Sequence, residues 1–212
     1  MGNTLLGNNG IANMFLGTTP VDKMYFNNNI VYEGLQIGDE YQGGYVYYIT
    51  GSYPNYSGYV ISKDTIVITD TCWGCYGVRV VNARNGSLGA GQSNTDAIIN
   101  EGCGGCGTPV GSAPTAAQAA TDYSGSGYTD WFLPTTGDWQ AIFSNNSKFN
   151  FLTSSFAYWT SVENSSLNDG LYFAYRANWS NPSQSGSISS SPKDAGLTFR
   201  AARAFTYVTG SI

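Results

Sequence analysis

The sequence predicts a mixed α+β fold in which β-strands dominate and the helices are short. Aromatic residues make up 15% of the 212 residues, whereas disordered chains are poor in aromatic residues, so we expect a folded body. Runs of β-branched and aromatic residues recur along the chain, and 27 glycines together with many Ser, Thr and Asn supply turns between them. Helix signals are few, and we predict two or three short helices.

The strands are expected in runs that are rich in Val, Ile, Tyr and Phe and are separated by polar loops. The run from Gly44 to Thr50 is an example, because β-branched and aromatic side chains fit the half-buried surface of a sheet. The sequence places strands at 44–50, 58–62, 65–69, 78–81, 158–162, 170–177 and 197–207.

Three segments show helix starts or helical spacing. Pro114 stands in the first turn of one segment, where a missing N–H is tolerated. Pro134 precedes another, in which Trp139 lies three and four residues before Ile142 and Phe143, so that these side chains share one apolar face. The helices are predicted at 94–100, 114–121 and 135–143.

The first thirty-odd residues contain a repeat with a period of ten. Its copies begin at Leu6, Leu16 and Phe26, and each has Gly or Asn after the first apolar residue. Gly and Asn tolerate a positive φ, so each copy can form a tight turn between short strands. We therefore divide the chain into a β-repeat segment, 1–33, and a body, 34–212. Two or three short strands are marginally stable in water, so the segment must pack on a partner or form an edge of the body.

The stretch from Phe15 to Tyr25 resembles the LGxxxVxKxY decamer repeats at the start of many phage tail and virion structural proteins. The resemblance implies that residues 1–33 attach the chain to a capsid or tail protein. Symmetric fibres are usually homo-oligomers, so we expect one here. The residues expected to make the attachment are Phe15, Leu16, Val21, Tyr25 and Val31.

Six blocks of the body occur in the order of a bacterial and phage family. The blocks lie at 43–48, 73–75, 89–95, 127–134, 158–163 and 199–205. They resemble the family named for the C-terminal domain of a collagen-like adhesin, which is similar to the formylglycine-generating-enzyme and C-type lectin-like folds. The resemblance spans about 34–207 and implies a C-type lectin-like body, but it is less specific for activity.

The aromatic and charged residues of these blocks have structural interpretations. Arg200 and Arg203 lie three apart in a strand-like run and tend toward opposite faces, so we expect one of them to pair with Asp130 or Glu163. The aromatic side chains expected in the core are Tyr158, Trp159, Phe199 and Phe205.

The cysteines form two C-x2-C pairs, Cys72 with Cys75 and Cys103 with Cys106. Two such pairs in a protein made in a reducing cytosol favour a structural zinc ion held by four thiolates. Disulfides formed after cell lysis and free thiols remain alternatives. A redox role needs the motif at a helix N-terminus after a strand, which neither pair clearly shows.

The composition disfavours several classes of function. The chain has no histidine, so nucleophiles activated by His and metal sites ligated by His are excluded. A net charge of −5 leaves the chain without a surface that could neutralise phosphates, so binding to nucleic acid is disfavoured. No run of residues is apolar enough for membrane insertion. No pair of carboxylates is singled out for catalysis, and we expect no enzyme activity.

A cluster of aromatic and amide residues predicts a ligand-binding surface. These groups suit the faces and hydroxyls of sugars, although Trp179 fits a packing role equally well. The residues are Tyr172, Tyr175, Asn178, Trp179 and Asn181.

We therefore expect a non-enzymatic phage protein that is made in the bacterial cytoplasm and resides in the virion as a tail fibre, head fibre or capsid decoration. Its body would bind a glycan or protein of the host surface and mediate host attachment. The alternatives are a purely structural decoration protein and an enzyme of the formylglycine-generating-like fold.

Overall fold

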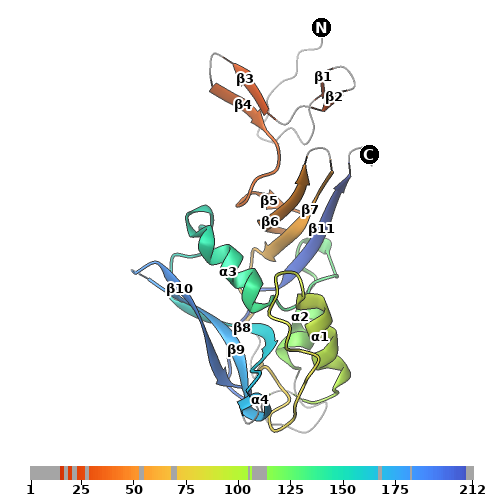
Figure 1. The fold of residues 1–212 in the computed structure, drawn as a ribbon, viewed down its shortest axis with the longest axis vertical. Helices are drawn as coiled ribbons and strands as arrows, with labels where there is room; N and C mark the ends of the chain where they lie inside the picture. The colour runs from red at the N-terminus through yellow and green to blue at the C-terminus, as the bar shows by residue number, and fades with distance from the viewer. Residues whose placement is uncertain are drawn as a thin grey trace.

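Strands form most of the regular structure, and the predicted α+β class is confirmed (Figure 1). The computed structural model describes residues 15–16, 19–20, 23–26, 29–52, 55–67, 71–104, 106, 114–166, 169–181 and 183–208. Within these residues there are eleven strands, four α-helices and two 3-10 turns. None of the described helices is long and apolar enough to cross a membrane.

A four-stranded antiparallel sheet lies at the centre of the body. It comprises β5 (Glu40–Tyr41), β6 (Gly44–Ser52), β7 (Asn55–Ser62) and β11 (Ala202–Val208), in the order β11-β7-β6-β5. Strand β11 comes from the end of the chain and pairs with β7 along its whole length. The sheet therefore ties the first part of the body to the last.

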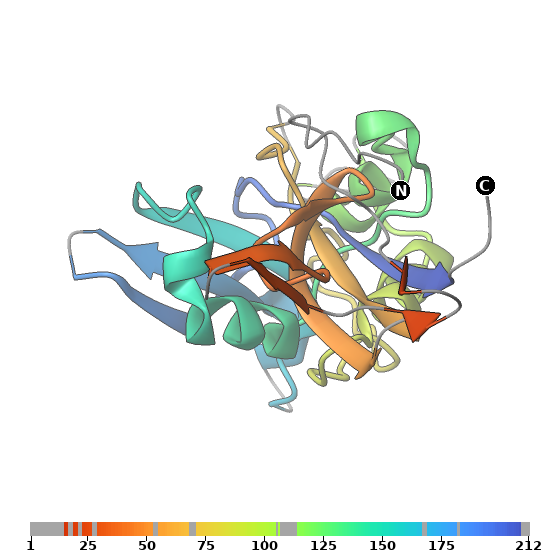
Figure 2. The same ribbon diagram turned by 90° about the horizontal axis from the view of Figure 1, so that it is seen from above.

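A second antiparallel sheet has the order β10-β9-β8 and follows the helices in the chain. Its strands are β8 (Phe156–Glu163), β9 (Phe173–Ser180) and β10 (Ser185–Pro192). Figure 2 shows this sheet and α3 (Thr136–Ser144) on one side of the central sheet. Helices α1 (Gly91–Asn100) and α2 (Ala116–Asp122) lie on the other side.

Two apolar cores match these layers. In one core, Val46 and Val60 of the central sheet pack with Ile98 of α1 and with the alanines of α2. In the other core, Ile61 packs with Trp139 of α3. Alternate side chains of the central sheet thus enter different cores, which places this sheet between the two layers.

The predicted helices are confirmed with small shifts in their ends. Helix α3 begins with a capping box, in which the Thr135 hydroxyl accepts a bond from the Asp138 N–H and the Asp138 carboxylate accepts one from the Thr135 N–H. Helix α2 is capped by Thr115, whose hydroxyl accepts a bond from the N–H of Gln118, so Pro114 lies just before the cap and not in the first turn, where it was predicted. The predicted start of α3 is thus correct to within one residue, whereas α2 starts two residues later than predicted.

Four predicted strands need correction, and one strand was missed. The strand predicted at 197–207 begins only at Ala202. Residues 78–81 form a loop, and α4 (Asp169–Tyr172) occupies the start of the strand that was expected at 170–177. Of the predicted strand 65–69, only Ile66 makes a described bridge, to Phe199, and 68–69 lie outside the described residues. Strand β10 was missed because its sequence, SGSISSSP, has low strand propensity.

The expected core aromatics and one expected ion pair are confirmed. Tyr158, Trp159, Phe199 and Phe205 are all buried. Arg203 pairs with Asp130 and lies over the ring of Tyr128, 3.9 Å from its centroid. Glu163 has other partners, described below.

The N-terminal repeat forms two short antiparallel pairs. Strand β1 (Phe15–Leu16) pairs with β2 (Thr19–Pro20), and β3 (Lys23–Phe26) pairs with β4 (Asn29–Glu33). Of the residues expected to attach the chain, Phe15 and Leu16 lie in β1, Tyr25 in β3 and Val31 in β4, whereas Val21 lies outside the described residues. Figure 1 shows these strands at one end of the molecule and α4 at the other.

Loss of a core aromatic tests the core in which Phe199 packs with Val46, Val60 and Ile98. Phe199 is fully buried and bridges to Ile66, so Phe199→Ala is expected to lower the free energy of unfolding by about 3–5 kcal/mol. Urea denaturation measures this change. The control is Val67→Ala at an exposed position, expected to change stability by no more than about 0.5 kcal/mol. Equal effects of the two substitutions would contradict the assigned core.

Candidate functional site

Exposed apolar side chains gather at the end of the molecule that carries α4. Tyr76 is 45% exposed, Tyr172 is 42% exposed and Val78 is 38% exposed. The rings of Tyr76 and Tyr172 have centroids 5.1 Å apart at an interplanar angle of 55°. We call Tyr76, Val78 and Tyr172 the tyrosine patch.

A tight turn between Cys75 and Val78 presents the patch. The N–H of Val78 donates to the carbonyl of Cys75 at 3.0 Å, and the N–H of Gly77 donates to the carbonyl of Leu171 in α4 at 2.8 Å. Gly77 has a φ of +81°, a conformation that side chains disfavour. This bond joins the turn to α4, so Tyr76 and Tyr172 are brought together although they are distant in sequence.

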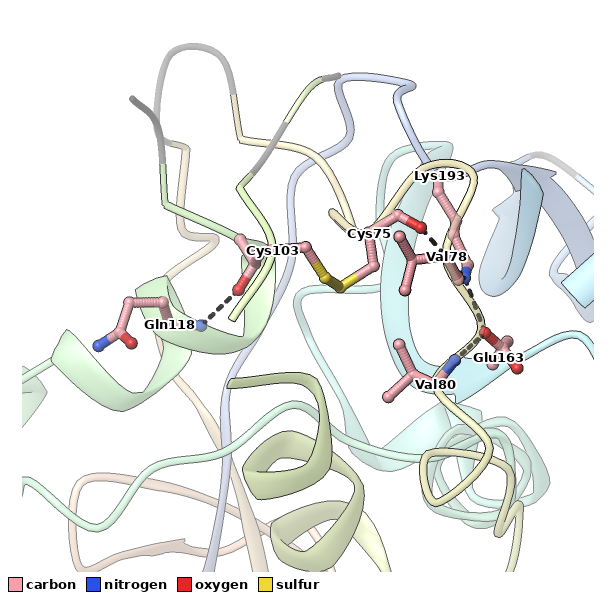
Figure 3. Close-up of a disulfide and its surroundings, with 8 residues drawn as sticks. Cys75, Val78, Val80, Cys103, Gln118, Glu163 and Lys193 are labelled. Atoms are coloured by element: carbon pink, nitrogen blue, oxygen red, sulfur yellow. Dashed lines mark hydrogen bonds and ion pairs between the residues drawn. A yellow bond between two sulfur atoms is a disulfide. The ribbon is translucent and has the colours of Figure 1, made fainter. Parts of the chain in front are cut away.

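Two disulfides hold the turn to the rest of the body. Cys75 is bonded to Cys103, as Figure 3 shows, and Cys72 is bonded to Cys106. The Cα atoms are 4.9 Å apart in the bond from Cys72 and 5.0 Å apart in the bond from Cys75. Each bond joins one cysteine of each C-x2-C pair, so the two pairs face one another.

The disulfides are one of the alternatives that the sequence left open for Cys72, Cys75, Cys103 and Cys106. A zinc ion needs thiolate ligands, and a sulfur in a disulfide is not a thiolate. Apart from these bonded cysteines, the described residues contain no cluster of three or more metal-ligating side chains. Zinc stays a prediction for the reduced chain, in which the facing pairs would bring four thiolates together.

A buried ion pair supports the turn from beneath. Both Lys193 and Glu163 are fully buried, and the Lys193 ammonium donates to Glu163 Oε1 at 2.7 Å (Figure 3). It also donates to the carbonyl of Val78 at 2.7 Å and lies over the ring of Trp73, 4.7 Å from its centroid. Burial lowers the pKa of Lys193 below its ordinary value, and the contacts with Glu163 offset only part of this effect.

Glu163 joins this lysine to the loop that the sequence had predicted as a strand. Its Oε1 atom accepts a bond from the N–H of Val80 at 2.6 Å, and its Oε2 atom accepts one from Arg84 at 2.8 Å. The N–H of Val80 is thus bonded to a side chain rather than to a neighbouring strand, which explains why 78–81 form a loop.

The residues predicted to bind a ligand are spread along β9 and its two ends. Tyr172 lies in α4, before β9, and Asn181 follows the last residue of β9. Eight residues of extended strand separate them, which corresponds to roughly 26 Å. Tyr175 lies in β9 and is half-buried, and Asn178 donates to the Ser189 hydroxyl of β10 at 2.9 Å.

Trp179 has the packing role that the sequence left open. It is 3% exposed, its indole N–H donates to the carbonyl of Leu152 at 3.0 Å, and its ring stacks on Phe143. It contributes one wall to a polar groove of about 320 Å³. The groove is lined by Asn146, Ser147, Lys148, Phe149, Asn150, Leu152, Thr153, Trp179 and Gln184.

Comparison with family models, curated proteins and solved structures found no match to this chain. The geometry of the tyrosine patch is therefore the main evidence on function. Two exposed aromatic rings and an aliphatic side chain, held by covalent and buried ionic contacts, can bind a partner by burial of apolar surface and by hydrogen bonds to the phenol groups.

Tyr172 was among the residues predicted to bind a ligand, whereas Tyr76 and Val78 were not. A signal was present, since Tyr76 stands between a cysteine and a glycine. A disulfide-linked cysteine and a glycine two residues later mark a constrained turn. The side chain that lies between them tends to project into solvent.

Alkylation distinguishes disulfides from a zinc site. Protein unfolded in denaturant without reductant is expected to incorporate no iodoacetamide, because both disulfides block the thiols, and to incorporate it at all four cysteines after reduction. Mass spectrometry counts the labels, with reduced protein as the positive control. Labelling after treatment with a chelator alone would contradict the disulfides and support zinc.

Proposed function

We propose that this chain is a non-enzymatic phage virion protein that displays its body for attachment to the host surface. Residues 1–33 bind a capsid or tail protein, and residues 34–212 contact a glycan or protein of the host. The protein is made in the bacterial cytoplasm and resides in the virion, as a homo-oligomer. The decamer repeat supports the first part, because its short strands need a partner to bury their apolar faces.

The position of the tyrosine patch carries this proposal. The patch includes Tyr172 of α4, which lies at the opposite end of the molecule from β1 to β4 (Figure 1). A protein attached through its N-terminal strands would present this end outward. Exposed large apolar side chains held rigidly at such an end favour a binding role, because rigid contacts lose little conformational entropy on association.

The body is best assigned to a C-type lectin-like fold. Two antiparallel sheets, short helices and long connecting loops are compatible with that fold. The six blocks of sequence support the assignment independently, since they occur in the family's order. Such folds host many activities, so the binding role depends on the patch rather than on the fold.

Removal of both exposed rings tests the binding role. The double substitution Tyr76→Ser and Tyr172→Ser is expected to weaken binding of the labelled chain to envelopes of host bacteria by about tenfold or more, because the apolar contact area is lost. Its unfolding midpoint should stay near that of the unmodified chain, since both side chains are exposed.

The matched control for this experiment is Val67→Ser, which removes an exposed apolar side chain from a different loop. Binding of the control should equal that of the unmodified chain. Undiminished binding of the double variant would show that the patch is not the contact surface.

Deletion of residues 1–33 tests the attachment role. The shortened chain is expected to remain folded, so the aromatic residues of the body should give an unchanged near-ultraviolet circular dichroism spectrum. It is expected to be absent from purified particles. Immunoblotting of particles from infected cells measures incorporation. Normal incorporation of the shortened chain would exclude these residues as the anchor.

A further inference from the structure

A second hollow lies on the central sheet, on a surface that no predicted site residue contributes to. It is a groove of about 400 Å³ across β6, β7 and β11. Its lining consists of Tyr48, Thr50, Ser57, Gly58, Tyr59, Leu88, Ala204, Phe205 and Thr206. This volume is within the range of small-ligand sites in proteins.

The strand register arranges the groove in two rows. Tyr48 of β6 lies opposite Tyr59 of β7, which lies opposite Ala204 of β11. A second row, of hydroxyl side chains, lies two residues from the first row on each of the same three strands. It consists of Thr50, Ser57 and Thr206. Because side chains two apart point to the same face of a sheet, the tyrosine row and the hydroxyl row line one surface.

The tyrosine row is fixed by packing on its inner side. The ring of Tyr59 lies 6.2 Å from that of Tyr48 and stacks on buried Tyr47 at 6.0 Å, measured between centroids. It also meets Phe132 edge-on. Both groove rings are only half-buried, so each keeps exposed surface above a rigid base.

The floor of the groove depends on Gly58. A Cβ atom at this position would lie 2.0 Å from the backbone oxygen of Tyr48 and 2.9 Å from the ring of Phe205. Glycine therefore permits the close approach of β6 and β7 beneath the hollow. The lining contains no Asp, Glu, Lys or Arg, although such residues occur elsewhere on the body.

We propose that this groove binds a neutral glycan, with sugar rings resting on Tyr48 and Tyr59 and their hydroxyls bonded to Thr50, Ser57 and Thr206. Aromatic faces bind the apolar C–H faces of pyranose rings, and serine and threonine hydroxyls both donate to and accept from sugar hydroxyls. An acidic sugar, a nucleic acid or a phosphate would lack a cation here.

The proposal goes beyond the role of the tyrosine patch, because it adds a second site with its own ligand class. The groove belongs to the central sheet, while the patch belongs to the turn at Cys75–Val78 and to α4. No residue is shared between them. Substitutions in one surface therefore serve as controls for the other.

The test is calorimetric titration of the full chain with maltohexaose, cellohexaose, laminarihexaose, mannohexaose and chitohexaose, with polygalacturonate oligosaccharide as the acidic probe. At least one neutral probe is expected to bind with a dissociation constant of about 1 mM or lower. Tyr48→Ala should weaken that binding by about tenfold or more, through loss of the stacking surface.

A second variant blocks the groove from a position outside the core. Thr206→Arg places a long side chain over the exposed row and should abolish binding, whereas Asn100→Arg at the exposed end of α1 adds the same charge elsewhere and should leave binding unchanged. Tyr172→Ala should also leave it unchanged. These results would support the groove even where Tyr48→Ala unfolds the chain.

The proposal is overturned by absence of binding to every neutral probe at up to about 10 mM. It is also overturned by unchanged binding in Thr206→Arg, or by a preference for the acidic probe that weakens with salt. If Tyr172→Ala abolishes binding of the neutral probes and Thr206→Arg does not, the probes bind at the tyrosine patch, and the groove is excluded as their site. None of these outcomes alters the test of host attachment through the patch.

Discussion

The buried carboxylate of Glu163 is the constraint on which the outer end of the body depends. It ends β8 and accepts bonds from Lys193, from Arg84 and from the N–H of Val80. This side chain thus joins three segments of chain, namely β8, the loop that contains Val80 and Arg84, and the residue that follows β10. Removal of one partner from a buried ion pair typically costs about 3–5 kcal/mol, because a charge is left buried without compensation. The loops at this end are therefore tied to one another through a single buried carboxylate.

The exposed tyrosines follow from this arrangement rather than from local sequence preference. Lys193 reaches from Glu163 to the carbonyl of Val78, while the disulfide at Cys75 fixes the other end of the same turn. With both ends held, the side chain of Tyr76 is left outside the core. The turn thereby holds an apolar side chain in solvent, where it contributes nothing to stability through burial.

The sequence predicted those parts of the molecule whose causes are local. Helix α3 was predicted because its cap and apolar face lie within a few residues of one another. Residues 78–81 were wrongly predicted as a strand because the N–H of Val80 binds a carboxylate 83 positions away, which no window of sequence reveals. Strand β10 was missed for a related reason. Its serines have low strand propensity, yet it pairs with every residue of β9.

The candidate sites were only partly predictable, because burial of charge and exposure of aromatic residues are tertiary outcomes. Lys193, Glu163, Arg200 and Arg203 are buried in a chain with only 11% charged residues. Their burial reduces the charge available on the surface, and the tyrosine patch contains no formal charge. Contacts made through aromatic rings and hydroxyls are screened little by salt, unlike contacts between exposed charges. A binding surface without formal charge thus favours partners that are recognised by shape and neutral hydrogen bonds.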